Sequence, residues 1–155
     1  MLDQLIDQID LEAGFPPSEP SEIPKLDFWT QLHPEIVQHS KPRYDAGHFA
    51  DSVETAFKHI NAKVKDSVRS RANKELDGAS LMNTAFSPNA PVIPLADLST
   101  ESGRNVQQGY MQIFAGSMTG IRNPNAHGNI PIEPKEAMHL LFLASHLLYK
   151  LDGRL

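Results

Sequence analysis

The chain contains no cysteine among its 155 residues, which excludes disulfide bonds and thiolate metal sites. It also has no run of 18 uninterrupted apolar residues, so the sequence predicts no membrane-spanning helix. The first 14 residues have neither the basic start nor the apolar centre of a signal peptide, and we therefore expect a cytoplasmic protein. A length of 155 residues is enough for one domain with its own hydrophobic core.

The sequence also has no excess of positive charge. Fourteen basic residues stand against 19 acidic residues, for a formal net charge of −5. Because proteins that bind nucleic acid over a whole surface are usually basic, the total counts against a non-specific binder. One stretch departs from this balance, with Asp66 as its only acid and six basic residues: Lys58, Lys63, Lys65, Arg69, Arg71 and Lys74. This stretch is either a solvated helix face or an electrostatic guide for a polyanion.

Several motifs of known chemistry are absent from the sequence. It contains no glycine-rich nucleotide-binding pattern, no His-Glu-x-x-His metal motif and no Gly-x-Ser-x-Gly nucleophile elbow. His139 and His146 are seven residues apart on one predicted helix face, but no acidic residue at a suitable spacing completes a metal site. We therefore expect no metal and no cofactor, and interpret these two histidines as structural.

The spacing of apolar residues predicts an all-α protein, since it follows steps of three and four without period-two alternation. Residues 1–12 read as a short helix that ends before Gly14, and residues 15–24 form a proline-rich linker. We place a boundary near Lys25, so that residues 1–25 are the helix and linker and residues 26–155 form the helical domain. The helices expected in that domain begin at Phe28, with an interruption at Lys41-Pro42, and continue at 43–72, 81–86, 103–121 and 134–151, with a loop at 87–100.

The last two long helices carry features of a subunit interface. The helix at 134–151 has one apolar face and a second face with Met138, Phe142 and Tyr149. A helix that is apolar over so much of its circumference is buried on more than one side. The helix at 103–121 has small residues along one side, which permit another helix to approach closely. The sequence therefore predicts a symmetric homodimer.

A short segment between these helices, Arg122-Asn123-Pro124-Asn125-Ala126-His127, carries the chemistry of most interest. Arginine binds phosphate with a forked pair of donors, and a neutral histidine exchanges protons near pH 7. Pro124 disfavours helical geometry at Asn123, so we expect a bend there that lets Arg122 and His127 face one pocket. The alternative is an ordinary Asn-Pro-Asn turn in which neither side chain has a catalytic task.

Several ordered stretches resemble the HEPN-type family with a Ymh-like C-terminal domain. The resemblance runs from about Leu32 to Asp152 and leaves residues 1–30 outside. It rests on the following segments: Leu32–Ile36, Gly47–Phe49, Glu54, Ala56–Lys58, Leu81–Asn83, Ala85–Phe86, Gln108–Tyr110, Ala115–Gly116, Gly120–Pro124 and Ala126–His127.

The resemblance implies a HEPN-like helical bundle and, as in many members of the wider group, a metal-independent endoribonuclease of toxin–antitoxin or antiphage defence. It implies that Arg122 and His127 are catalytic at a dimer interface, with Asn123 in support, and that an antitoxin or regulatory protein is a possible partner. RNA would be cut to 2′,3′-cyclic phosphate or 3′-phosphate ends. Supporting contacts to substrate are expected from helix residues Glu54, Lys58, Lys65 and Arg69. The alternative function is a HEPN-like interaction module that dimerises and binds a partner protein or nucleotide without cutting RNA.

Overall fold

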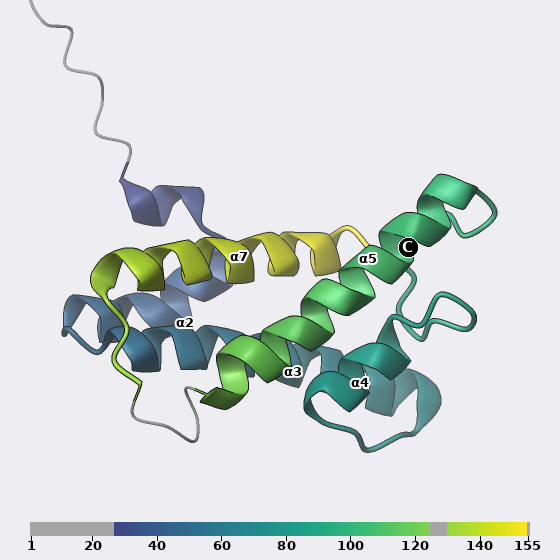
Figure 1. Ribbon diagram of the computed structural model, residues 1–155, viewed down its shortest axis with the longest axis horizontal. Coiled ribbons are helices and arrows are strands. Elements are labelled where there is room, and N and C mark those ends of the chain that lie inside the picture. Colours follow the sequence, from purple (N-terminus) through teal and green to yellow (C-terminus); the bar gives the residue numbers. More distant parts are fainter. Residues whose placement is uncertain (1–26, 125–129, 155) are drawn as a thin grey trace, which may run out of the picture.

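The computed structural model describes residues 27–124 and 130–154. Over these ranges the protein is all-α and contains no strand, which confirms the predicted fold class. No helix in the described ranges is long and apolar enough to cross a membrane. The elements, shown in Figure 1, are η1 (Phe28–Gln31), α2 (Pro34–Asp45), α3 (Phe49–Ala72), α4 (Gly78–Ala85), α5 (Glu101–Ser117), η2 (Met118–Arg122) and α7 (Pro134–Asp152).

Helix α3 is the centre of the bundle. It packs against α2, α4, η2 and α7, while α5 packs mainly on α4 (Figure 1). The predicted apolar stripe explains this position, because its side chains at Val53, Phe57, Ile60 and Val64 are completely buried. Leu141, Leu147 and Leu148 of α7 close the same core. The bundle therefore rests on the helices that the apolar spacing predicts.

The boundary between α2 and α3 differs from the prediction. We expected Lys41-Pro42 to interrupt the helix, but α2 runs through Pro42 to Asp45, and the chain turns instead at Gly47, where φ is +84°. The proline lies close to the end of the helix, so few helical hydrogen bonds are affected. The Tyr44 ring meets Trp29 and Phe49 edge-on, with centroids 5.3 and 4.9 Å away, and this packing holds the last turn.

The loop at 87–100 is confirmed, and a single buried side chain holds it in place. Gln107 of α5 donates from Nε2 to the carbonyl oxygens of Phe86 and Ile93, both at 3.1 Å. Its Oε1 accepts from the backbone N–H of Leu95 at 2.7 Å. Every polar atom of this amide is therefore paired with loop backbone, which lets Ile93 and Leu95 enter the core.

Part of the second apolar face of α7 is covered within the chain. The Phe142 ring packs edge-on against Phe28 of η1 at a centroid distance of 5.2 Å, and Tyr149 packs against His33 at 4.7 Å. Both residues remain substantially exposed, at 41% for Phe142 and 52% for Tyr149. The start of the domain thus accounts for some of the apolar character that the sequence analysis attributed to a subunit interface.

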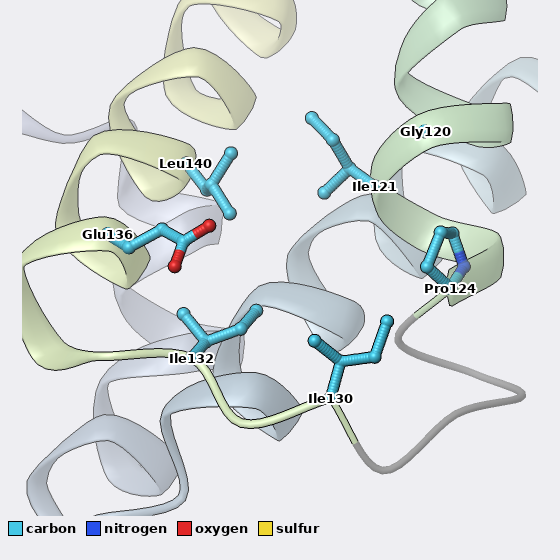
Figure 2. Close-up of a pocket in the computed structure, with 7 residues that line it drawn as sticks. All are labelled: Gly120, Ile121, Pro124, Ile130, Ile132, Glu136 and Leu140. Atoms are coloured by element: carbon cyan, nitrogen blue, oxygen red, sulfur yellow. The ribbon is translucent and has the colours of Figure 1, made fainter.

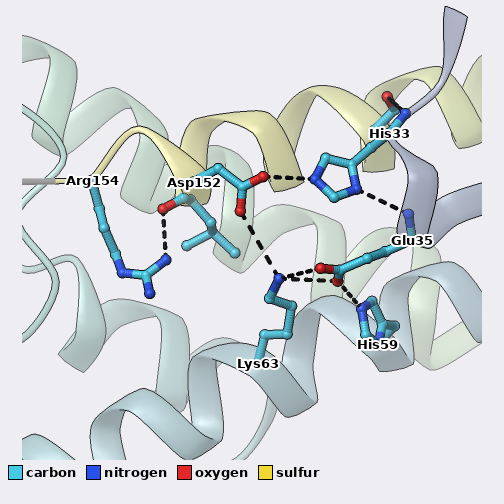
Figure 3. Close-up of polar contacts among 8 residues, drawn as sticks. His33, Glu35, His59, Lys63, Asp152 and Arg154 are labelled. Carbon is cyan, nitrogen blue, oxygen red and sulfur yellow. Dashed lines mark hydrogen bonds and ion pairs between the residues drawn. The ribbon is translucent and has the colours of Figure 1, made fainter.

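A polar cluster ties the C-terminal end of α7 to α2 and α3 (Figure 3). The Nδ1 atom of buried His33 accepts from the Glu35 N–H at 3.1 Å, so Nε2 carries the proton and donates to Asp152 at 2.7 Å. Lys63 donates to both Glu35 oxygens, at 2.8 and 2.9 Å, and His59 also bonds Glu35. The cluster thus links three helices around two carboxylates.

This cluster predicts a stability change at acid pH. Hydrogen bonds from His59 and then Lys63 lower the pKa of Glu35 from 4.5 to about 2. A lowered carboxyl pKa stabilises the fold above pH 4.5, and that contribution is lost as the pH falls to about 2. We expect Glu35→Gln to lower the unfolding free energy at pH 7 by roughly 1–2 kcal/mol, allowing for solvent screening of a one-third exposed side chain.

Urea unfolding of the wild type and Glu35→Gln between pH 7 and pH 2 measures this contribution. The difference between the two proteins should shrink below pH 4.5 and disappear near pH 2. Asp66→Asn, at a largely exposed carboxylate within α3 that lies 3.5 Å from Arg69, is the control and should show little difference at any pH. A constant difference over the whole range would contradict the role given to the Glu35 carboxylate.

Candidate functional site

The backbone around Arg122 is a π-helical turn that continues α5. The N–H of Asn123 bonds to the carbonyl of Met118, five residues earlier, and Asn123 itself is helical, with φ −65° and ψ −45°. The bend predicted at Asn123 is therefore wrong, because helical geometry persists through Pro124. Two features explain this: a π turn is wider than an α turn, and η2, whose Met118 is buried, packs on α3 and α4.

The Arg122 side chain is directed toward the start of α4. Its Nη1 donates to Oδ2 of Asp77 at 3.1 Å, and the side chain is 19% exposed. Its Nε is buried and has no hydrogen-bond partner among the described residues. Asp77 thus holds one nitrogen of the guanidinium, and part of the Arg122 side chain remains exposed to solvent.

Asp77 is itself fixed by a buried asparagine in the middle of α3. Asn61, 5% exposed, donates from Nδ2 to Oδ1 of Asp77 at 2.7 Å and accepts the Gly78 N–H at 3.0 Å. The Asn61 hydrogen bond, followed by the hydrogen bond and charge of Arg122 and the charge of Lys65, lowers the pKa of Asp77. The carboxylate therefore remains ionised at neutral pH and carries a full charge opposite Arg122.

The predicted substrate contacts on α3 divide into two groups. Glu54, Lys58 and Lys65 recur at helical spacing with Asn61, so they share a stripe that leads toward Asp77 and Arg122. Glu54 and Lys58 form an ion pair with each other. Arg69 instead pairs with Glu75 and Asp66, and the hydrogen bond that it donates to Glu75 raises the pKa of Arg69. Much of the basic stretch is therefore neutralised locally.

Two of the three predicted catalytic residues are described. Arg122 ends η2, and Asn123 follows it with an exposed side chain. His127 lies outside the described residues, so the predicted pairing of Arg122 with His127 stays a prediction. The sequence analysis missed Asn61 and Asp77. Asn61 could have been found from the sequence, because it is a polar residue at helical spacing with three of the predicted substrate contacts.

A small pocket separates η2 from the start of α7 (Figure 2). Its volume is about 160 Å³, and its lining is apolar apart from one carboxylate, that of Glu136. The lining residues are Gly120, Ile121, Pro124, Ile130, Ile132, Glu136 and Leu140. Because this lining carries no positive charge, the pocket suits an apolar group better than a phosphate.

The two histidines of α7 that we interpret as structural, His139 and His146, lie in different environments. His146 Nε2 and the Tyr110 hydroxyl lie 2.7 Å apart in a hydrogen bond between α7 and α5. His139 is exposed and directly precedes Leu140 of the pocket lining. Across residues 27–124 and 130–154, no group of three histidine or acidic side chains is arranged to hold a metal ion.

Comparison with known proteins places the chain in a family. The family model described as "Protein of unknown function (Hypoth_ymh)" matches residues 30–151, which include α2, α3, the Arg122 segment and α7 up to its last residue. The chain belongs to the Hypoth_Ymh family. No curated protein and no solved structure matches it. The Hypoth_Ymh match coincides with the span of the sequence resemblance, whereas the wider HEPN relationship and its Arg-x4-His motif remain predictions.

Proposed function

We propose that this Hypoth_Ymh protein is a metal-independent endoribonuclease of HEPN type, acting in toxin–antitoxin or antiphage defence. Arg122 and His127 are its catalytic pair and Asn123 supports them. The products are 2′,3′-cyclic phosphate or 3′-phosphate ends. An antitoxin or regulatory protein that neutralises this activity is a further partner in the proposal.

The observation that best supports this proposal is the environment of Arg122. Its charged group lies at the end of a π-helical turn, partly exposed, with its rotamer held by an ionised carboxylate. π turns occur frequently at functional sites. The carboxylate that holds Arg122 is itself bonded by buried Asn61, so the direction of the guanidinium is set from the core of the bundle.

The chemistry follows from the two side chains. A neutral His127 accepts the proton of the ribose 2′-hydroxyl while the 2′-oxygen attacks the phosphorus. The bond to the 5′-oxygen breaks, and a second imidazole, in its protonated form, gives that oxygen a proton. Arg122 stabilises the negative charge that accumulates on the phosphoryl oxygens. Lys65, on the stripe toward Asp77, is placed to attract the RNA backbone.

We further propose that the second imidazole comes from a second copy of the chain. Helix α5 and η2 carry an exposed face with Gly109, Ile113, Gly116 and Gly120 at helical spacing. A Cβ added at any of these three glycines would meet nothing within 4 Å, and Ile113 is 42% exposed. The next position of this spacing is Asn123, the residue after Arg122, so pairing the face with its own copy brings two Arg122 segments near one cleft.

The dimer is tested by Gly116→Leu. In an isolated monomer this exposed glycine has room for a side chain, and replacing a helical glycine should stabilise the fold by about 0.5–1 kcal/mol. If the face packs closely on its copy, the leucine instead keeps the two helices apart. We expect light scattering at micromolar concentration to show a dimer for the wild type and a monomer for Gly116→Leu.

The matched control is Ala62→Leu, at an exposed position on α3 away from that face. It should remain a dimer. A wild type that is monomeric at micromolar concentration, or a Gly116→Leu protein that stays dimeric, would contradict the interface.

The second candidate function is an interaction module that binds a partner protein or nucleotide without cutting RNA. The net charge of −5 and the ion pairing of Lys58 and Arg69 favour it. Incubation of purified protein with total RNA, with His127→Ala in parallel, distinguishes the two functions. The nuclease predicts cleavage by the wild type only, whereas equal RNA integrity in both reactions favours the interaction module.

A further inference from the structure

We infer that Asp77 and Asn61 are positioning residues that set the direction of the Arg122 guanidinium toward the scissile phosphate. This inference rests on the proposed nuclease function and adds two residues to it. It starts from a continuous chain of hydrogen bonds across three elements, from α3 through the start of α4 to η2. The two bonds measure 2.7 Å from Asn61 to Asp77 and 3.1 Å from Arg122 to Asp77.

The chain of hydrogen bonds is anchored at its inner end. Asn61 is buried, and its carbonyl oxygen is committed to the Gly78 N–H at the first residue of α4. Gly78 has a positive φ of +60°, and a Cβ at this position would lie 3.8 Å from Nη1 of Arg122. The backbone at Gly78 therefore lies within contact distance of the guanidinium, and the Asn61 hydrogen bond holds one oxygen of the Asp77 carboxylate.

A phosphate would bind at the Arg122 end of this chain of hydrogen bonds. Nη1 is occupied by Asp77 and Nε is buried, so Nη2 is the guanidinium nitrogen that bonds none of the residues that the structure describes. A long arginine side chain loses considerable rotamer freedom when it is ordered. Because Asp77 and Asn61 impose that order before substrate arrives, the donor is preorganised for the charge that develops in the transition state.

An exposed ion pair alone would not support this inference, since such pairs contribute little to stability. Asp77 is half-exposed, and a merely electrostatic partner of Arg122 would not need a buried anchor. The Asn61 amide distinguishes a positioning role of Asp77 from a purely electrostatic one. A buried side-chain amide whose nitrogen and oxygen are both hydrogen-bonded fixes the orientation of its partners. A substitution that keeps the hydrogen bond from Asn61 but makes the contact with Arg122 unfavourable therefore separates a positioning role from a contribution to stability.

Asp77→Asn is that substitution. The new amide oxygen still accepts from Asn61 Nδ2, which leaves its NH₂ group facing Nη1 of Arg122, donor against donor. We expect kcat for cleavage of a single-stranded RNA to fall by about 10-fold, because one hydrogen bond between charged groups is replaced by a repulsive contact. KM should change less, and the Arg122 Nε–H signal in the NMR spectrum should shift. Asp45→Asn, at a half-exposed carboxylate paired with Lys41 outside the proposed site, is the matched control and should behave as wild type.

The decisive comparison repeats Asp77→Asn in an Arg122→Ala background. If Asp77 acts through Arg122, the second substitution lowers kcat no further. An equal fall in both backgrounds would overturn the inference, as would an unchanged kcat in the single variant while the wild type cleaves RNA. If the wild type cleaves no RNA, the proposed function and this inference fail together. If the wild type cleaves RNA and either of the outcomes above is observed, only this inference fails.

Discussion

His127→Ala is expected to lower the rate of RNA cleavage by about 10²–10⁴-fold, the range that a positioned proton-transfer group supplies. The methyl group of alanine neither accepts the 2′-hydroxyl proton nor returns one to the leaving oxygen. If two copies of His127 share one cleft as base and acid, both are lost at once, and the effect lies toward the upper end of the range. Single-turnover cleavage of a labelled single-stranded RNA measures it.

The control for this variant is His139→Ala, which removes an exposed histidine of α7. It should cleave at the wild-type rate. Circular dichroism and thermal unfolding establish that both variants keep the helical fold. Equal cleavage by wild type and folded His127→Ala would remove His127 from the mechanism.

Arg122→Lys should lower kcat by about 10²-fold, near the lower end of what removal of one preorganised donor costs. Lysine keeps the positive charge but lacks the planar fork. Its ammonium cannot contact Asp77 and a phosphate with separate, fixed nitrogens, as the guanidinium can. Steady-state kinetics should therefore show the loss mainly in kcat, with a smaller change in KM.

Arg104→Lys is the matched control, because Arg104 is an exposed arginine of α5 that bonds only loop carbonyls in the described part of the chain. We expect it to keep wild-type kinetics. A folded Arg122→Lys protein with unchanged kcat would show that the forked geometry of Arg122 has no part in cleavage.

The fold was largely predictable because its main signal is periodic. The stripe from Val53 to Val68 is buried as its spacing predicts, and the loop at 87–100 follows from its prolines. The errors lie where tertiary packing outweighs local preference. Pro42 is accommodated near the end of α2, and Asn123 stays helical before Pro124. In both places the local rule describes an isolated chain, whereas buried neighbours fix the backbone in the folded protein.

The candidate site was predictable only in part. Arg122 is singled out by the segment in which it occurs, but its environment depends on residues far away in the sequence. Asp77 lies 45 positions from Arg122, and Asn61 a further 16 before Asp77. Periodicity carries no information about such pairings. The basic stretch on α3 was visible as charge, and the pair of Glu54 with Lys58 follows from their helical spacing. The pairs of Arg69 with Glu75 and of Lys63 with Glu35 emerge only in three dimensions.

Cleavage of single-stranded RNA in excess chelator, with analysis of the new ends, tests the central claim most directly. The proposed mechanism assigns the proton transfers to His127 and the stabilisation of the phosphoryl charge to Arg122, so it requires no divalent ion. The account predicts undiminished cleavage by the wild type, 2′,3′-cyclic phosphate or 3′-phosphate ends, and little cleavage by folded His127→Ala. Cleavage that stops when chelator is added, or products with 3′-hydroxyl ends, would contradict it.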